Sequence, residues 1–318
     1  MALGTTRPAS WSVHASMVAL VFLWGLAFVA IKDGNQHMSW VTLTFLRFLL
    51  ADILFIGYLA LRRTARIRPK RRDLPALVAL GFLGFTGYHF LLNLGESFPD
   101  VTAGTAALII ASDPAFIALF AVPILGQRLG RVRAAGISLA FVGLGVMIFL
   151  ARPGSEFRFE LNSGALLIVP PALFSAVYLV LGRRYLTTYR PFVFVAYTIL
   201  IGTVLSLPVV LTTWGTFIAD VTTMGWAGFL PVLFLSVGPT FIGYGIWFRA
   251  VERMPAAAAG AYLYISTLIA VLGGIVLLQE PITLATILGG ALVVGGVAVA
   301  QHLGKRSNGS VQAGRTRS

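Results

Sequence analysis

The 318-residue sequence contains no cysteine and only four histidines, and these shortages exclude several classes of protein. Without cysteine there are no disulfides, thiolate metal sites or cysteine nucleophiles. The histidines show no metal-ligand spacing, so we expect neither a metal nor a cofactor. A chain so poor in nucleophile–base combinations is weak material for an enzyme.

Charge is also scarce, because charged residues make up 11% of the chain and hydrophobic residues 58%. A soluble domain is usually about 25% charged, so the surplus of apolar residues must face lipid. A membrane-spanning helix needs roughly 20 mostly apolar residues. Ten such spans are predicted, at 13–31, 39–61, 74–95, 101–121, 130–151, 163–181, 191–212, 224–248, 256–277 and 283–302.

The net charge of +13 gathers on one side of these spans. All but four of the 24 lysines and arginines fall in segments on the same side as the N-terminus, most densely at 62–72. Positive residues concentrate in cytoplasmic loops. We therefore predict a protein of the inner (cell) membrane with both termini cytoplasmic and no role in nucleic-acid binding. The Gly/Ser/Arg-rich tail, 304–318, is predicted to be disordered.

An internal repeat divides the chain into halves at 11–151 and 163–303. Residues 22–29 align with 172–179, residues 84–98 align with 237–251, and residues 126–136 align with 279–289. Each half contains five spans, so the second half enters the membrane from the opposite side. The predicted fold is an all-α integral membrane protein with ten transmembrane helices, arranged as two inverted five-helix repeats around a central cavity. This architecture is typical of secondary transporters that work by alternating access.

Short motifs support this interpretation. They are W-G-x-x-F at Trp24–Phe28 with Lys32 after it, Arg47 in the second span, and Q-E-P-I-T…G at 279–289. With these motifs the chain resembles EamA-type members of the drug/metabolite transporter superfamily over nearly its whole length, and YddG-type amino-acid exporters in cavity chemistry. The resemblance implies ten helices, cytoplasmic termini and export of amino acids or other small metabolites. One departure is that the family's loop glutamate is present as Glu280 but is replaced by Gln127 in the first half.

Asp113-Pro114 lies near the expected midplane of the fourth span. Pro114 has no N–H group, so the Ile110 carbonyl loses its helical partner and must be satisfied by protein, water or a ligand. Two interpretations stand. Either Asp113 receives an ammonium group or a proton, or Pro114 kinks the helix and Asp113 hydrogen-bonds a neighbour. The repeat places Ser266-Thr267 here in the second half, which favours a one-sided role for Asp113.

Other polar residues occur within the spans. Arg47 and Asp52 are interpreted as structural charges that hold helices together. His89 and Asn93 lie on one face of the third span, where they either satisfy structural hydrogen bonds or line the cavity beside Tyr88. Aromatic residues at helical spacing complete the set. The predicted substrate-binding residues are Trp24, Phe28, Tyr88, His89, Asn93, Asp113, Phe174, Tyr178, Tyr244, Trp247, Tyr262 and Ser266.

The leading functional hypothesis is a secondary exporter of amino acids with aromatic or apolar side chains, whose partners are a small-molecule substrate and the lipid bilayer. A multidrug or organic-cation exporter of the same fold is the alternative, since Asp113 would also suit a cation. A sugar-phosphate or nucleotide-sugar antiporter is disfavoured because Arg47 is the one basic residue deep within a span. An intramembrane enzyme or a channel ranks lower still. The sequence does not indicate the oligomeric state.

Overall fold

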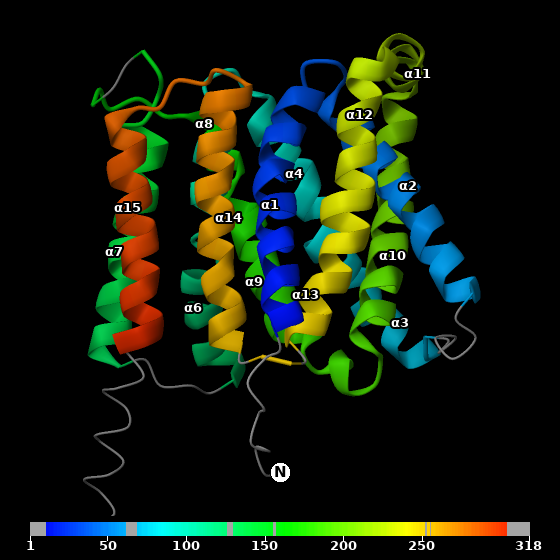
Figure 1. Cartoon of the computed structure of the whole chain (residues 1–318), viewed down its shortest axis with the longest axis horizontal. Coiled ribbons are helices and arrows are strands. Elements are labelled where there is room, and N and C mark those ends of the chain that lie inside the picture. The colour runs from blue at the N-terminus through cyan, green and yellow to red at the C-terminus, as the bar shows by residue number, and fades with distance from the viewer. Residues whose placement is uncertain are drawn as a thin grey trace, which may run out of the picture.

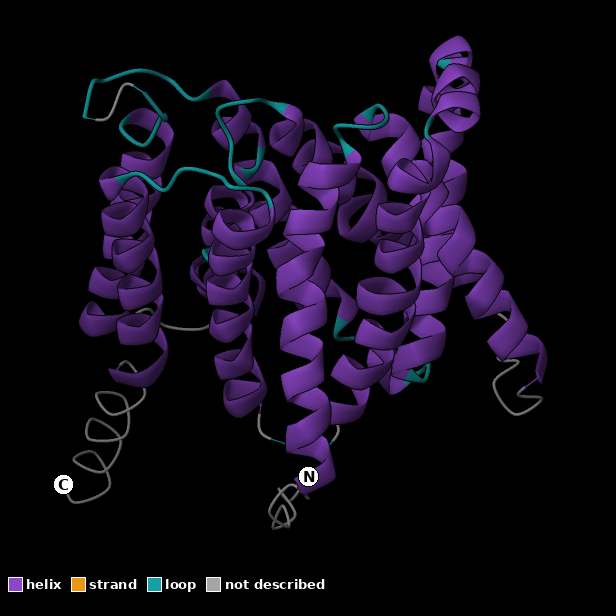
Figure 2. Ribbon diagram, turned by 45° about the horizontal axis from the view of Figure 1, so that its top comes forward, coloured by secondary structure: helices purple, strands orange, loops and turns teal. Residues whose placement is uncertain are grey.

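The protein is described by a computed structural model at residues 11–61, 69–125, 130–154, 157–251, 253–254 and 256–303. This part of the chain is helical and contains no strand. Most helices run along one direction and form a single bundle (Figure 1; Figure 2). The start of α1 and the end of α15 lie on the same face of the bundle, here called the terminal face; the other is the opposite face. The predicted tail, Gln127 and residues 62–68 lie outside the described residues.

Each half of the chain forms a series of helices. The first half contains α1 (Trp11–Gly34), α2 (Trp40–Leu61), η2 (Arg71–Asp73), α3 (Leu74–Gly81), η3 (Phe82–Thr86), α4 (Gly87–Ser97), α5 (Ala103–Ile110), α6 (Asp113–Leu125) and α7 (Arg131–Phe149). The second half contains α8 (Ser163–Leu167), α9 (Val169–Gly182), η4 (Tyr185–Thr187), α10 (Pro191–Thr212), α11 (Trp214–Thr223), α12 (Gly225–Leu235), η5 (Ser236–Gly243), α13 (Tyr244–Val251), α14 (Ala256–Leu277), α15 (Leu284–Ala298) and η6 (Val299–Leu303).

The predicted ten-span architecture is confirmed. Nine helical stretches within the described residues are long and apolar enough to cross a membrane, and α14, with 22 residues, is the tenth. Large apolar side chains such as Phe22, Ile53 and Leu268 remain more than half exposed on the helices. A soluble protein rarely exposes extensive apolar surface, so these side chains identify the lipid-facing perimeter.

The third and eighth spans each contain a π-helical segment, η3 and η5. The repeat alignment places these segments at equivalent positions in the two halves. A π-helical turn inserts an extra residue into a helix and is frequent at functional sites. In η5 the carbonyl of Pro239 accepts a hydrogen bond from Trp24 Nε1 at 3.0 Å, which fixes the first span against the eighth.

The fourth span consists of two helices, because α5 ends at Ile110 and α6 begins at Asp113. Ser112 lies in the turn between them, where its hydroxyl donates to the Ile109 carbonyl at 2.6 Å and its own carbonyl accepts from the Ala115 amide at 2.8 Å. Pro114 falls in the first turn of α6, where a missing N–H group costs no helical hydrogen bond. The equivalent helix of the second half, α14, is continuous.

Two features were not predicted from the sequence. The sixth span is also interrupted, between α8 and α9, where Pro170 and Pro171 open the second helix. A short helix, α11, joins the seventh and eighth spans on the opposite face (Figure 1). Its Asp220 accepts hydrogen bonds from the Ser39 and Thr42 hydroxyls at 2.6 and 2.7 Å, which attaches α11 to the start of α2.

Helices α7 and α15 pack backbone to backbone through paired glycines. A Cβ on Gly136 would lie 2.6 Å from the Gly296 carbonyl, and one on Gly143 would lie 2.5 Å from the Gly289 carbonyl. The pairing is reciprocal, since a Cβ on Gly296 or Gly289 would meet the Gly136 or Gly143 carbonyl in turn. The repeat aligns Gly136 with Gly289 and Gly143 with Gly296. The point where α7 and α15 cross therefore lies on the approximate two-fold axis that relates the two halves.

Candidate functional site

A cavity of about 260 Å³ lies between the two halves. Its walls come from α1, α2, α9, α14, the η3–α4 and η5–α13 spans and the α5–α6 break, and they are mostly apolar. Small-molecule pockets measure about 300–1,000 Å³, so this cavity is at the small end of the range. Nine of the predicted substrate-binding residues line it: Trp24, Phe28, Tyr88, His89, Asp113, Tyr178, Tyr244, Trp247 and Ser266.

Three predicted residues lie away from the cavity walls. Asn93 is fully buried and donates from Nδ2 to the Thr44 hydroxyl at 2.7 Å, so it faces α2. Phe174 packs against Phe82, with ring centroids 6.0 Å apart. The Tyr262 hydroxyl is 2.7 Å from His14 Nδ1. Helical spacing therefore selected the right helices, but not always the right face of each.

Arg47, interpreted from the sequence as a structural charge, lies in the cavity wall and is 4% exposed. Its Nε atom donates to the Thr240 hydroxyl at 3.0 Å, and Nη1 is 3.3 Å from His89 Nδ1. No carboxylate of the described residues lies within ion-pair distance of its guanidinium. Arg47 is thus a buried cation without a counter-ion of its own.

His89 is oriented by this contact. A guanidinium only donates, so Nδ1 is the accepting nitrogen and the neutral ring carries its proton on Nε2. Aromatic rings surround the imidazole, with Tyr88 and Phe48 centroids at 4.6 and 4.9 Å. His89 therefore supports Arg47 and adds no charge to the cavity.

Asp113 supplies the acidic side chain of the cavity. It is in the first turn of α6, and its Oδ1 atom is buried without a hydrogen-bond partner. Ser175 of α9 also lines the cavity and acts on this carboxyl group through its side chain. No lysine, arginine or histidine in the described ranges forms an ion pair with it.

Arg47 and Asp113 both lie near Tyr88. Both Arg47 and Asp113 act electrostatically on the Tyr88 hydroxyl, which itself lies in the cavity wall. An apolar cavity with one buried guanidinium and one buried carboxyl group matches a small molecule that carries both charges, because each buried group then gains a partner of opposite charge.

Aromatic rings form a wall beside these charges. Trp24 lies 5.9 Å from Tyr244 and 5.4 Å from Trp247, measured between ring centroids. Such clusters offer flat apolar surface for a substrate side chain. The repeat-related Tyr178 closes another part of the wall, with its hydroxyl 3.4 Å from that of Thr198.

Sequence reasoning missed three polar residues that line the cavity, namely Ser175, Tyr264 and Thr267. The Tyr264 hydroxyl is buried without a partner, like Asp113 Oδ1. The sequence of α14 could have indicated two of them, because Tyr264 and Thr267 are one helical turn apart and therefore share a face of the helix. Ser175 aligns with Gly25 in the repeat, so a search for polar residues beside the W-G-x-x-F motif would have found it.

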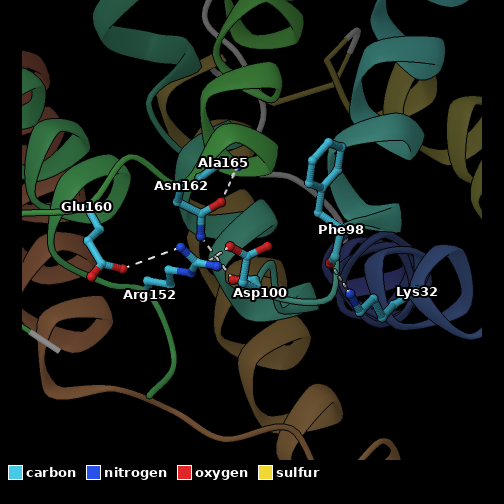
Figure 3. A network of polar contacts seen from close by, with 7 residues as sticks. All are labelled: Lys32, Phe98, Asp100, Arg152, Glu160, Asn162 and Ala165. Atoms are coloured by element: carbon cyan, nitrogen blue, oxygen red, sulfur yellow. Dashed lines mark hydrogen bonds and ion pairs between the residues drawn. The ribbon is translucent and has the colours of Figure 1, made fainter. Parts of the chain in front are cut away.

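A second polar network lies on the opposite face and holds residues 98–102, the α4–α5 loop. Lys32 at the end of α1 donates to the Phe98 carbonyl at 2.7 Å, and Asn162 Nδ2 donates to the Asp100 carbonyl at 3.0 Å. Arg152 pairs with the Asp100 carboxylate at 3.1 Å (Figure 3). The loop that leads into the broken fourth span is therefore fixed by the end of α1 and by the segment that connects the two halves.

Glu280, the loop glutamate of the Q-E-P-I-T motif, also acts on this face. Its carboxylate accepts from the Ala103 amide at 2.9 Å, and so caps the N-terminus of α5. Burial raises the pKa of Glu280, while the Ala103 hydrogen bond and the charge of Lys32 oppose that shift. The motif therefore contributes an N-terminal cap from the second half to a helix of the first.

Replacing Glu280 by alanine is expected to lower the free energy of unfolding by about 1–2 kcal/mol, because a helix cap and its favourable dipole interaction are lost. Equilibrium unfolding in mixed micelles measures this change. Glu160→Ala is the matched control, since Glu160 forms an exposed pair with Arg152, and a loss below about 0.5 kcal/mol is expected there. Equal losses in the two variants would show that Glu280 is not an effective cap.

A bundle of ten membrane-spanning helices, in two related halves around a cavity with fixed charges, defines the class of protein as a multi-pass membrane transporter. The EamA-like transporter family matches the chain twice, at residues 11–149 and 162–300. The chain therefore belongs to this family of transporters.

Curated relatives agree with this assignment. An uncharacterized transporter of Archaeoglobus fulgidus is 30% identical over 91% of this chain and 97% of its own. A probable terminal-alkyne amino-acid exporter of Streptantibioticus cattleyicolor is 30% identical over 93% of this chain and 96% of its own. A probable amino-acid metabolite efflux pump of Escherichia coli is 27% identical over 88% of this chain and 91% of its own. A solved crystal structure has the same fold, with a TM-score of 0.62 and 23% sequence identity. The match covers 93% of this chain and 98% of that one.

Proposed function

We propose that this protein is a secondary exporter of amino acids with aromatic or apolar side chains, located in the inner membrane. The observation that carries the proposal is the pairing of an uncompensated Arg47 and an uncompensated Asp113 in one small cavity. In this arrangement Arg47 receives the substrate carboxylate and Asp113 receives the ammonium group. The names of two relatives, an amino-acid exporter and an amino-acid metabolite efflux pump, support the same substrate class.

The remaining lining suits the rest of such a substrate. The cluster of Trp24, Tyr244 and Trp247 offers apolar faces to a side chain. The small volume supports a substrate of amino-acid size over a nucleotide sugar. Alternating access is the proposed mode of transport, in which the two halves exchange conformations around the bound substrate.

An organic-cation exporter is the second candidate, favoured by the unpaired Asp113 carboxyl alone. On that proposal the ammonium group is the essential feature of the substrate and Arg47 has no substrate contact. The two candidates differ in whether a substrate without a carboxylate is transported.

Counterflow in proteoliposomes with three related compounds tests the proposal. L-phenylalanine carries both charges, phenethylamine only the positive one, and hydrocinnamate only the negative one. We expect saturable counterflow with phenylalanine and none with the singly charged compounds, and L-leucine extends the test to aliphatic side chains. Transport of phenethylamine in preference to phenylalanine would favour the cation exporter, and the absence of amino-acid counterflow would refute the amino-acid proposal.

A further inference from the structure

Glu96 is a buried carboxyl group that the central cavity does not use. It lies in the last turn of α4 and is 0% exposed, and neither carboxyl oxygen has a hydrogen-bond partner among the residues that the structure describes. The Oδ1 atoms of Asn93, on α4, and Asn35, near the end of α1, are also buried without partners. Buried polar groups are nearly always hydrogen-bonded. This group of oxygen acceptors at the opposite face therefore lacks a donor.

Lys32 is a cation that acts on Glu96, but its ammonium group is engaged elsewhere. It donates to the backbone carbonyls of Glu96 and Phe98, at 3.0 and 2.7 Å. An ammonium group has three N–H donors, and two of them are committed to these carbonyls. The side chain of Glu96 is therefore left without an ion pair while Lys32 holds the α4–α5 loop.

The other charged and titratable groups around Glu96 offer no better partner. Arg47 of α2 acts on Glu96, but its guanidinium is hydrogen-bonded to Thr240 and His89. Glu280, in the α14–α15 loop, is itself acidic and therefore repels a charge on Glu96. Tyr88 of its own helix is a further titratable neighbour. Asp100 of the α4–α5 loop also acts on Lys32, but its carboxylate is paired with Arg152. Of the other elements packed against α4, helices α5, α8 and η3 contain no charged or titratable side chain, and α9 contains only Tyr178.

We propose that Glu96 is a proton-binding site, and that its proton determines whether Lys32 stays on the α4–α5 loop. A bound proton removes the buried charge and supplies an O–H donor to this group of acceptors. Asn93 is three residues earlier on α4, so the two side chains share a helix face. The amide oxygen of Asn93 is the acceptor for that donor.

Loss of the proton to water at the opposite face leaves a buried carboxylate. That carboxylate attracts Lys32, whose ammonium keeps its three protons and leaves the Phe98 carbonyl to form an ion pair. The α4–α5 loop then loses one of its attachments. Because this loop leads through α5 to Asp113, the proton on Glu96 is linked to the helix pair that carries the cavity carboxyl. This inference goes beyond the proposed substrate and does not depend on it.

Infrared spectroscopy of the purified full chain in lipid tests proton binding directly, without any substrate. A protonated carboxyl gives a carbonyl band that shifts in heavy water, and we expect Glu96→Gln to remove part of that band at neutral pH. Glu160→Gln is the control, because Glu160 lies in the same polar network but is partly exposed and paired with Arg152. An unchanged band in Glu96→Gln would overturn the proposal.

A distance measurement tests the effect on the loop. The chain has no cysteine, so spin labels at Pro99→Cys, in the α4–α5 loop, and at Ile282→Cys are the only ones attached. We expect the distance distribution to change between about pH 5 and about pH 9, the range that contains the titration of buried glutamates. Glu96→Gln should keep the low-pH distribution throughout, and Glu160→Gln should behave like the parent. If Glu96→Gln does not fold, Lys32→Met decides the question by abolishing the pH response. A response that survives either change, or no response in the parent, would contradict the proposal.

Discussion

Replacing Asp113 by asparagine is expected to reduce amino-acid transport about 100-fold or more in kcat/KM. Asparagine keeps the size of the side chain, but it removes the one carboxyl group among the described residues that line the cavity. Truncating one partner of a buried charge pair costs about 2–5 kcal/mol, since the other charge is left unpaired. The uptake of labelled phenylalanine under counterflow, at matched protein levels, measures the loss.

Asp52→Asn is the matched control for this variant. Asp52 is also a buried intramembrane carboxyl with an unpartnered Oδ1, but it does not line the cavity. Its replacement should change transport less than about threefold, an effect below 1 kcal/mol. Arg47→Gln should instead weaken the preference for phenylalanine over phenethylamine, which lacks the carboxylate. Equal losses in the Asp113 and Asp52 variants would remove the substrate role of Asp113.

Replacing Gly143 by leucine is expected to prevent stable folding, with a cost of more than about 3 kcal/mol. A Cβ at this position would lie 2.5 Å from the Gly289 carbonyl and 2.7 Å from the Val293 amide, both of which are backbone atoms of α15. Small residues allow membrane helices to approach this closely, and no side chain can turn aside to make room. Loss of the monodisperse peak in size-exclusion chromatography, or a lowered midpoint of thermal unfolding, reports the effect.

Gly145→Leu distinguishes a local clash from a general loss of glycine. Gly145 is two residues further along α7, and a Cβ there would meet no atom within 4 Å. We expect this variant to fold like the parent, because the added side chain points away from the crossing into open space. Two variants of equal stability would show that α7 and α15 do not meet at the distance described.

The number and order of the helices could be predicted because hydropathy and length determine membrane spans almost alone. The division into two halves followed from aligned motifs, and the structure places two π-helical segments at matching positions. Neither segment could be foreseen, because a π turn depends on how neighbouring helices pack. The amphipathic helix α11 was missed since it is too short and too polar to count as a span. The interruption of the sixth span was not predicted either, although Pro170 and Pro171, which begin its second helix, are visible in the sequence.

The candidate site was predictable at the level of helices and less so at the level of faces. Trp24, Tyr178 and Asp113 were expected in the cavity and line it. Asn93 was placed with His89 by helical spacing, yet it turns towards Thr44 because that hydroxyl offers a partner. Rotation of a helix about its axis is decided by contacts of this kind, which hydropathy does not encode. The free guanidinium of Arg47 is a further case, since a missing ion pair is visible only in three dimensions.

The interruption between α5 and α6 makes the two halves unequal at the point where they face the cavity. A carrier built from two identical halves would present the same site to either side of the membrane, with equal half-saturation concentrations in both directions. Here Asp113 and the helix break belong to one half, and a continuous α14 stands opposite. If the halves exchange conformations during transport, no symmetry then holds the half-saturation concentrations on the two sides equal. Without a gradient, the ratio of maximal rate to half-saturation concentration is nevertheless the same in both directions. Transport at low concentration is then equally fast in both directions, so the direction that is faster at saturating concentration is the property set by the fold.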